Sequence, residues 1–502
     1  MSSQGMDPRS GRSIGEPIAD TGSAELDRLA EVASAAFPRW AATSREQRAR
    51  VLEEVAGALD TEAPALAAIA DAETALGLPR LQGEIQRTSG QLRLFARVIR
   101  EGGYLEAILD SPDPTAAPPR PDLRRMLRPL GPVAVFGASN FPFAFSIAGG
   151  DTVSALAAGC PVLAKAHPAQ PGTAKATFDV VAEALKRAGA PEGVFAVVYG
   201  TPAGLDLVRH PAIKAVGFTG STRGGRHLFD LAQARPEPIP FYGELGSLNP
   251  VVVLPGAAAT RATAIAQGYA ASLTLGVGQF CTNPGLLFAP QALLPALGEA
   301  IAATRGGPML TAGMRDAYES GMGEMTRHAE RLGQGQADAT HNEVAPHLFH
   351  VDVHRFLQSP QHYLDEHFGP AGLVVTYDDI AELMAAVELM PGALTASVHA
   401  ESEDAALAAP LLSALAARAG RLVYNAWPTG VAVSWSMQHG GPWPATTNPL
   451  HTSVGATAIR RWLAPVCYQD WPEALLPLEL HADNPMRIPR RVDGRLQPGS
   501  QA

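Results

Sequence analysis

The sequence contains very few cysteines for its length. Only 3 of its 502 residues are cysteine, and Cys160, Cys281 and Cys467 lie far apart without any C-x-x-C spacing. This scarcity excludes a disulfide framework and provides no ligand pattern for structural zinc, so we expect no metal site. It also favours a reducing compartment, and we expect the protein in the cytoplasm.

Long apolar runs and clusters of positive charge are also missing. No uninterrupted apolar stretch approaches the roughly 18 residues of a membrane-spanning helix, and the polar N-terminus lacks the apolar core of a signal peptide. The formal net charge is −10, with 39 Lys and Arg against 49 Asp and Glu. Nucleic acids and anionic membranes are therefore poor partners, and we expect a small-molecule partner.

What the sequence does have, after Gly131, is an alternation of short apolar runs and amphipathic segments. The runs "PVAVFG", "PVLAKA", "GVFAVVYG" and "AIKAVGFTG" predict strands, and segments such as "TAKATFDVVAEALKRAG" predict helices between them. This alternation favours an α/β fold with a doubly wound parallel sheet. A second α/β unit starts near "NPVVVLP" and includes the strand candidates "LVVTYD" and "TASVHA".

Cys281 lies in the unusual stretch "GVGQFCTNPG". A free cysteine is most often a buried, inert residue. Here the glycines at 276 and 278 and the turn residues 283–285 predict an irregular loop in which the backbone closely approaches another group. A nucleophilic role is the alternative to a packing role.

Three other positions have two interpretations each. Asn140 follows a strand and precedes Pro142, so it is a turn residue or a donor to an oxyanion. Glu244 ends the strand in "FYGELG" and is a structural acid or a general base with a raised pKa. "GFTGSTRGG" predicts a turn at Gly220 and a helix capped by Ser221, which is a plain connection or an anion site.

In combination these motifs resemble the aldehyde dehydrogenase superfamily. "SNFP", "KAHPAQPG", "GFTGSTRGG", "ELGSLNP", "GQFCTNPG" and "EHFGP" occur in the order typical of that family, from about residue 24 to the C-terminus. "HGGPWPATTNPLHTSVG" and "RWLAPVCYQDWPEALLP" are most similar to its NADP-preferring 2,5-dioxovalerate (α-ketoglutarate semialdehyde) dehydrogenases. Bacterial fatty aldehyde dehydrogenases share many of these signatures.

The resemblance implies a covalent mechanism. Cys281 attacks the aldehyde carbon to give a thiohemiacetal, and the Asn140 amide with the Cys281 backbone N–H holds the oxyanion. Loss of hydride gives a thioester, which water activated by Glu244 hydrolyses to a carboxylate. The presence of Glu244 argues against a CoA-acylating enzyme, because thiolysis does not need that base.

The resemblance also implies a nicotinamide cofactor. It places Lys165 at the adenosine ribose, Ser221 after the Gly220 turn at the pyrophosphate, and Glu366 at the nicotinamide ribose beside Phe368. The preference between NAD and NADP depends on the groups near the ribose 2′ position.

No acidic residue follows Lys165 directly, and three residues could interact with a 2′-phosphate. They are His167, Thr173 and Arg209, which offer hydrogen bonds or positive charge. We therefore expect NADP, with NAD as the alternative and with Arg209 equally interpretable as a solvated helix-end cation.

The architecture implied by the resemblance has three parts and forms a homodimer or homotetramer, and the Gly, Ser and Pro content of the N-terminal residues predicts a flexible lead-in before them. The expected ranges are 1–23 for a flexible lead-in, 24–107 and 131–247 with a late segment near 440–464 for a cofactor domain, 248–439 for a catalytic domain, and 108–130 with 465–502 for an oligomerisation ribbon and tail.

The substrate side remains open at the level of sequence. A small anionic aldehyde such as 2,5-dioxopentanoate is expected from the resemblance, with 2-oxoglutarate as product. Hydrophobic aldehydes are the alternative, because aromatic residues could line an apolar tunnel; these are Phe141, Phe143, Phe145, Trp427, Trp435 and Trp443. A non-catalytic scaffold of the same fold is the alternative from another class.

Overall fold

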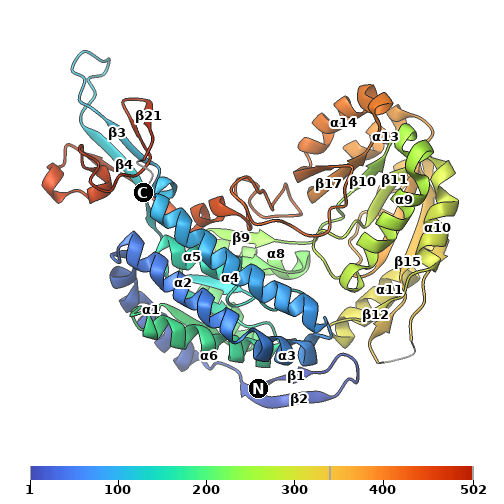
Figure 1. Ribbon diagram of the computed structural model, residues 1–502, viewed down its shortest axis with the longest axis horizontal. Helices are drawn as coiled ribbons and strands as arrows, with labels where there is room; N and C mark the ends of the chain where they lie inside the picture. The colour runs from blue at the N-terminus through green and yellow to red at the C-terminus, as the bar shows by residue number, and fades with distance from the viewer. Residues whose placement is uncertain (1, 339–340, 500–502) are drawn as a thin grey trace.

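Two parallel sheets and a small projecting sheet make up the protein. The computed structural model describes residues 2–338 and 341–499. The helical N-terminal part covers the first sheet, the second sheet lies on the opposite side of the molecule, and the small sheet extends away from both (Figure 1). The predicted α/β class is therefore confirmed.

Four helices precede the first sheet. They are α1 (Ser23–Ala41), α2 (Arg45–Thr61), α3 (Ala63–Thr74) and α4 (Leu78–Glu101). In α4 the apolar residues recur at helical spacing, and Leu81, Ile85 and Leu92 are almost completely buried. The apolar face of α4 therefore packs on the core, and the residues on its other faces can contact the candidate active site.

The first sheet has five parallel strands in the order β7-β6-β5-β8-β9. Its strands are β5 (Val133–Phe136), β6 (Val162–Lys165), β7 (Phe195–Val198), β8 (Ala215–Thr219) and β9 (Phe241–Glu244), and its helices are α5 (Gly150–Ala158), α6 (Pro171–Arg187), α7 (Thr201–Arg209) and α8 (Thr222–Gln233). Every residue of β5 is buried, as a central parallel strand requires. The carboxyl ends of these strands bring Asn140, Lys165 and Glu244 to one edge.

The second sheet has seven strands in the order β13-β15-β16-β11-β10-β17-β18, and only β13 at its edge is antiparallel. Its strands are β10 (Val251–Val253), β11 (Leu286–Ala289), β13 (Glu330–Gln334), β15 (His347–Asp352), β16 (Ala371–Thr376), β17 (Ala393–His399) and β18 (Ala419–Tyr424). The helices of this part are α9 (Pro255–Thr274), α10 (Leu294–Ala302), α11 (Ala312–His328), α12 (Val353–Gln358), α13 (Ile380–Glu388) and α14 (Ala405–Ala416), with a short pair β12 (Gly307–Pro308) and β14 (Glu343–Val344). The strands predicted in "NPVVVLP", "LVVTYD" and "TASVHA" are all present as β10, β16 and β17.

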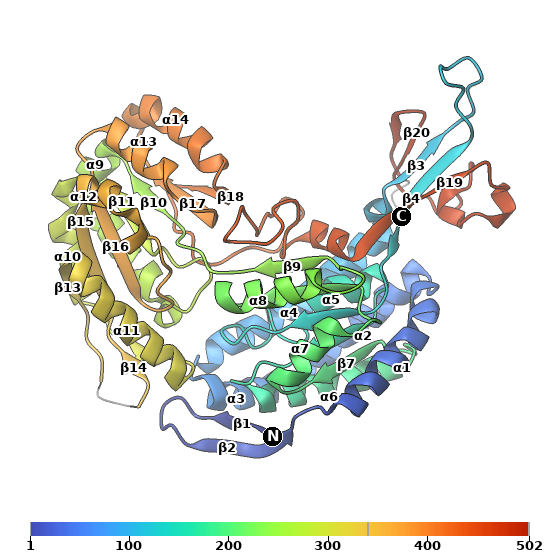
Figure 2. The same ribbon diagram turned by 180° about the vertical axis from the view of Figure 1, so that it is seen from behind.

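The projecting sheet combines two distant parts of the chain. Its strand order is β19-β4-β3-β20-β21, from β3 (Ala107–Asp110), β4 (Leu123–Pro129), β19 (Leu463–Gln469), β20 (Arg490–Val492) and β21 (Arg495–Gln497). Seen from behind, it stands clear of the helices (Figure 2). These strands come from the proline-rich and C-terminal ranges for which the sequence predicts a ribbon.

The N-terminal residues differ from the flexible lead-in expected for 1–23. Strands β1 (Ser2–Met6) and β2 (Ser13–Ala19) form an antiparallel hairpin below α3 and α6 (Figure 1). Polar contacts hold it, because Arg9 pairs with Asp71 at 2.9 Å and Thr21 N donates to Tyr199 O at 3.0 Å. Hairpin hydrogen bonds need no apolar periodicity, so composition alone suggested flexibility.

Candidate active site

Cys281 lies in an irregular loop between α9 and β11. The backbone at Gly276, Val277 and Gly278 adopts positive φ values of 57°, 59° and 65°. A Cβ on Gly278 would meet the carbonyl of Gly369 at 2.3 Å, so only glycine fits there. The Asn249 amide donates to Cys281 O at 2.8 Å and so fixes the nucleophile loop to the end of the "ELGSLNP" segment. The predicted close approach of backbone is therefore present.

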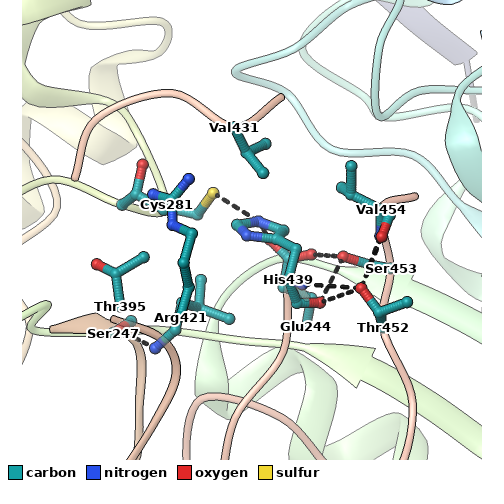
Figure 3. A network of polar contacts seen from close by, with 12 residues as sticks. Glu244, Ser247, Cys281, Thr395, Arg421, Val431, His439, Thr452, Ser453 and Val454 are labelled. Atoms are coloured by element: carbon teal, nitrogen blue, oxygen red, sulfur yellow. Dashed lines mark hydrogen bonds and ion pairs between the residues drawn. The ribbon is translucent and has the colours of Figure 1, made fainter. Parts of the chain in front are cut away.

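Glu244 is the last residue of β9 and is buried, with 3% of its surface exposed. Its Oε1 lies 2.9 Å from His439 Nε2, and its Oε2 accepts a very short hydrogen bond from Ser453 Oγ. Both partners come from the late segment of the chain, which lies between the two parallel sheets. The carboxylate therefore has polar partners on both oxygens (Figure 3).

The thiol, the imidazole and the carboxylate form one cluster. His439 Nε2 lies 3.5 Å from Cys281 Sγ and also contacts Glu244 (Figure 3). Ligand atoms of the three side chains are all within 4.8 Å of one another. A nucleophile with a base and a second group that orients the base is the arrangement of covalent catalysis.

Two pKa values in this cluster move in opposite directions. Burial, followed by the negative charge of Glu244, raises the pKa of the Cys281 thiol well above its usual range. Burial also opposes ionisation of Glu244, but His439 and hydrogen bonds from Ser453 and Cys281 outweigh it and lower the pKa of Glu244. These directions favour a neutral thiol beside an ionised carboxylate in the resting cluster.

Asn140 contacts the backbone of the loop that contains Cys281. Its side-chain Nδ2 donates to Gln279 O at 3.0 Å, two residues before the nucleophile. The amide has a second N–H, which leaves one donor for an oxygen bound at Cys281. The predicted pairing of Asn140 with Cys281 is thus geometrically available.

Helix α4 supports the Asn140 turn. Arg80 donates to Asn140 O at 2.6 Å, and Glu84 forms an ion pair with Arg80 at 3.3 Å. Burial raises the pKa of Glu84 to about 7, although Arg80 and the backbone N–H groups of Phe143 and Ala144 oppose that shift. Arg80 and Glu84 thus hold the backbone at Asn140, the residue predicted to donate to an oxyanion.

Sequence reasoning assigned no role to His439, Ser453 or Asn249. The motifs "HGGPWPATTNPLHTSVG" and "ELGSLNP" contain all three, but they served only as family signatures. Lone polar residues in glycine-rich stretches give no distance to a carboxylate 195 residues away in sequence. The available signal was a histidine directly beside two glycines, in a segment without strand or helix periodicity.

The expected cofactor residues on the first sheet lie at strand ends. Lys165 ends β6 and is buried; burial lowers its pKa to about 8, and Asp20 partly offsets this. Gly220 follows β8, and Ser221 caps α8 by accepting from Gly224 N at 3.2 Å. A buried amine and a solvent-facing helix N-terminus are donors that suit a ribose and a pyrophosphate.

Glu366 and Phe368 come from the second sheet's side. They line a cavity of about 480 Å³ together with Ser247, Gly278 and Phe280. Glu366 is exposed at the rim of this cavity, so its carboxylate is accessible to a ligand. A Cβ on Gly246 would come within 2.4 Å of the Glu366 carboxylate, so the "ELGS" backbone passes close beside this acid.

The three residues predicted near the 2′-phosphate are not equivalent. The Thr173 hydroxyl and N–H both donate to Glu73 at 2.7 Å, so this hydroxyl is already engaged by an acid from α3. Burial, aided by Lys165, lowers the pKa of His167 to about 4, and this ring is neutral at pH 7. Arg209 pairs with Asp206 on an exposed helix end at 3.2 Å, which is the solvated-cation alternative.

The aromatic residues do not form one tunnel. Phe141 packs against Phe145 at 5.2 Å and against Phe280 at 5.1 Å, beside the cluster. Trp427 packs on Tyr269, while Trp435 and Trp443 are exposed, with 54% and 48% of their surfaces accessible. Only the phenylalanine group lies next to Asn140 and the nucleophile loop.

Two further structural observations concern membranes and metals. Over residues 2–338 and 341–499, no helix has both the length and the apolar character needed to span a bilayer. The thiolate, imidazole and carboxylate of the catalytic cluster are also ligand types for transition metals. Assays of this protein therefore need a chelator control.

Comparison of the sequence with known proteins identifies the family of this chain. The aldehyde dehydrogenase family model matches residues 2–443. The alpha-ketoglutaric semialdehyde dehydrogenase 2 of Azospirillum brasilense is 47% identical, over 98% of this chain and 95% of its own. The alpha-ketoglutaric semialdehyde dehydrogenase of Acinetobacter baylyi is 44% identical, over 94% and 91%.

Solved structures agree in fold. A 1-pyrroline-5-carboxylate dehydrogenase from Thermus matches with a TM-score of 0.79 at 22% identity, over 93% of this chain and 90% of that chain. A crystal structure titled as a putative aldehyde dehydrogenase from Burkholderia cenocepacia also matches with a TM-score of 0.79 at 22% identity, over 94% and 97%. At this identity the likeness concerns the fold alone.

Proposed function

Because the chain belongs to the aldehyde dehydrogenase family, we propose that it oxidises 2,5-dioxopentanoate, the semialdehyde of 2-oxoglutarate, with NADP as hydride acceptor. The chain is an NAD(P)-dependent enzyme that acts on aldehydes, so the alternative hypothesis of a non-catalytic scaffold is rejected. The observation that carries the chemistry is the contact of Cys281 with His439 and Glu244. The substrate rests on the full-length similarity to the two semialdehyde dehydrogenases.

In the first step Cys281 attacks the aldehyde carbon. Since the thiol is protonated at neutral pH, its proton must leave as the carbon–sulfur bond forms, and the His439 and Glu244 pair receives it. The carbonyl oxygen becomes an oxyanion that accepts hydrogen bonds from the Asn140 amide and the Cys281 N–H. The product of this step is a thiohemiacetal.

In the second half of the reaction the former aldehyde carbon is oxidised and released as a carboxylate. The oxyanion re-forms its C=O bond as a hydride leaves the carbon, which gives a thioester; NAD(P), when bound, would accept that hydride. After the proton taken up in the first step has passed to solvent, Glu244 takes a proton from water, and the hydroxide attacks the thioester carbon and displaces the Cys281 thiolate. A cavity of about 250 Å³ lined by Glu244, His439 and Ser453 adjoins the carboxylate and has room for water.

The residues around the two sheet edges fit a nicotinamide dinucleotide. The donor set is Lys165 and the α8 N-terminus at Ser221, and Glu366 can accept from a ribose hydroxyl. When bound, NAD(P) supplies the acceptor for the hydride. The chain itself holds Glu366 and the residues just before Cys281, Gly278 and Phe280, around the same cavity.

For the choice of cofactor we propose NADP over NAD, and two local features support this proposal. Among the described residues Lys165 is buried and makes no ion pair, which leaves its ammonium group available for a phosphate. Glu73, which is near Thr173, has its oxygens engaged by three donors, which reduces its repulsion of a phosphate. Steady-state kcat/KM with NADP and with NAD, on the native protein and Lys165→Met, tests this choice. A native preference for NAD contradicts it.

Hydrophobic aldehydes are the second candidate substrate class. The contact of Phe141 with Phe145 and Phe280 beside the nucleophile loop favours them. The deciding experiment compares kcat/KM for 2,5-dioxopentanoate with that for a medium-chain alkanal, with EDTA present as the metal control. A strong preference for the alkanal overturns the proposed substrate but not the proposed chemistry.

For the assembly we propose a homodimer or homotetramer built on the projecting sheet. Exposed apolar side chains lie on it and on the connection between β19 and β20: Leu496 of β21 is 70% accessible, and Leu475 and Leu478 of the connection are 67% and 51% accessible. Strand β18 at the edge of the second sheet also exposes Tyr424. Light scattering behind size-exclusion chromatography measures the mass, and a monomer at micromolar concentration contradicts the proposal.

A further inference from the structure

Two arginines beside the nucleophile loop keep hydrogen-bond donors that have no partner. In Arg87 of α4, Nε and Nη2 are buried without an acceptor, and in Arg421 of β18 the same is true of Nε. Leaving such donors unpaired costs free energy, and more so on a cation. Unpaired donors beside a candidate active site therefore indicate that a bound ligand supplies the acceptors.

Both side chains converge on one short segment next to Cys281. Arg87 Nη1 donates to Val431 O at 2.7 Å, and Arg421 Nη1 donates to Gly430 O at 2.8 Å. Gly430 N in turn donates to the Thr282 hydroxyl at 3.2 Å, directly after the nucleophile. The two guanidinium groups therefore flank the nucleophile from two different parts of the fold.

Each arginine is also connected to the catalytic cluster by a second observation. Arg87 lies 5.3 Å over the ring of Phe145, and that ring lies 6.2 Å from the imidazole of His439. Figure 3 shows the Arg421 side chain extending toward Cys281, and the charge of a Cys281 thiolate acts on both guanidinium groups.

Arginines inside the molecule differ in their partners. Arg461 and the half-buried Arg80 pair with carboxylates, whereas the buried Arg45, Arg48, Arg235 and Arg490 take part in no ion pair among the described residues. Arg461 pairs with Asp151 at 2.6 Å, and Arg80 pairs with Glu84 at 3.3 Å. Among the ion pairs of the described residues neither Arg87 nor Arg421 takes part. The lack of an ion pair therefore does not single out Arg87 and Arg421. Their position does, because their unpaired donors lie beside the Cys281 loop, where an anionic ligand can supply the partner.

We propose that Arg87 and Arg421 form a carboxylate-binding subsite that faces Cys281 and selects aldehydes with a carboxylate at the far end of a short chain. Guanidinium groups suit a carboxylate because their planar N–H groups can match both of its oxygens. The proposal rests on the proposed function, since 2,5-dioxopentanoate carries its carboxylate at the end opposite the aldehyde. It assigns that end to the space between α4 and the 428–431 segment.

A competing role for the same charges is to stabilise the Cys281 thiolate. That role would affect every aldehyde alike, whereas a carboxylate subsite affects only substrates that carry the anion. The ratio of kcat/KM for 2,5-dioxopentanoate to that for pentanal, a neutral aldehyde of the same chain length, separates the two roles.

The kinetic experiment uses Arg87→Met, Arg421→Met and the milder Arg87→Gln and Arg421→Gln. We expect kcat/KM for 2,5-dioxopentanoate to fall about 100-fold, mainly through KM, and kcat/KM for pentanal to change less than about threefold. Arg93→Met is the matched control, because Arg93 lies on the same helix but pairs with Asp60 on the surface. Equal losses on both aldehydes in the folded glutamine variants overturn the subsite.

A second measurement does not depend on turnover or on the identity of the substrate. Iodoacetate and iodoacetamide alkylate the same thiol, but only iodoacetate carries a carboxylate. We expect the ratio of their inactivation rates to fall about tenfold in either methionine variant and to stay at the native value in Arg93→Met. An unchanged ratio overturns the subsite.

These two measurements also separate the subsite from the proposed function. If the native enzyme prefers another aldehyde over 2,5-dioxopentanoate, the proposed substrate is wrong, and the alkylation ratio alone decides the subsite. If the native enzyme prefers 2,5-dioxopentanoate and both ratios are insensitive to the arginines, the subsite is wrong and the function stands.

Discussion

Cys281 and Cys160 differ in exposure and in the group beside the thiol, because Cys160 is buried whereas Cys281 is partly exposed. Burial raises the pKa of both thiols, that of Cys160 to about 11. The Cys160 thiol donates to Trp462 O at 3.4 Å, a carbonyl that cannot accept its proton, whereas Cys281 lies 3.5 Å from the His439 imidazole and beside Glu244. The comparison favours a nearby proton acceptor and partial exposure, and not a low pKa, as the features that suit Cys281 to its proposed nucleophilic role.

The largest expected effect comes from removing each sulfur in turn. We expect Cys281→Ala to lower kcat by at least about 10⁴-fold, because no other group in the cluster can form the thiohemiacetal. Cys160→Ala should keep native kcat and lose about 1 to 2 kcal/mol of unfolding free energy, because it leaves a small cavity. Aldehyde-dependent cofactor reduction and urea denaturation measure the two effects, and substantial activity in Cys281→Ala contradicts the covalent mechanism.

Replacing Glu244 tests the acid that lies beside Cys281 and not beside Cys160. We expect Glu244→Gln to lower steady-state kcat about 10³-fold, because the amide cannot take a proton from water. The thioester should then accumulate, which is visible as a burst of reduced cofactor equal to the number of active sites. Rapid-mixing absorbance measures the burst, and undiminished steady turnover argues against the role of Glu244.

Removing the imidazole should make Cys281 resemble Cys160. In His439→Asn the thiol loses the nitrogen at 3.5 Å, and we expect kcat and the iodoacetamide alkylation rate to fall about 100-fold together. His399→Asn is the control, because this buried histidine packs on Trp427 and takes no part in the cluster. A loss of kcat with unchanged alkylation would assign His439 to a later step than thiol activation.

The smallest effect concerns the pH dependence of alkylation in the native protein. Because the pKa of Cys281 is raised, the thiolate fraction grows with pH throughout the range below that pKa. We expect the iodoacetamide rate at Cys281 to rise from pH 7 to pH 9, and Cys160 to stay unmodified while the protein is folded. Peptide mass spectrometry reads both sites, and a plateau already reached at pH 7 would contradict a raised pKa.

Much of the framework followed from local sequence patterns. The strands β5, β6, β8, β10, β16 and β17 were predictable because parallel strands are continuous apolar runs between helices. The loop around Cys281 was predictable because its glycines and prolines exclude regular structure. The hairpin at residues 2–19 was not, since it is held by backbone pairing and the Arg9 contact with Asp71.

The partners of Cys281 were only partly predictable. Asn140 and Glu244 were found because Asn140 lies a few residues beyond β5 and Glu244 ends β9, at the carboxyl ends of a parallel sheet where ligand-binding groups gather. His439 and Ser453 lie in a segment without periodicity, so nothing in their surroundings places them near Glu244. The engagement of Thr173 by Glu73 likewise depends on how α3 meets α6, which no local pattern encodes.

The return of the chain from the second sheet to Glu244 has a consequence for folding kinetics. His439 and Ser453 meet Glu244 across 195 and 209 residues, and Cys281 meets His439 across 158. Contacts this distant in sequence form late, because each must close a long loop after the sheets have formed. During refolding, helical circular dichroism should therefore recover before catalytic activity, and a chain released early from the ribosome would have both sheets but no working base.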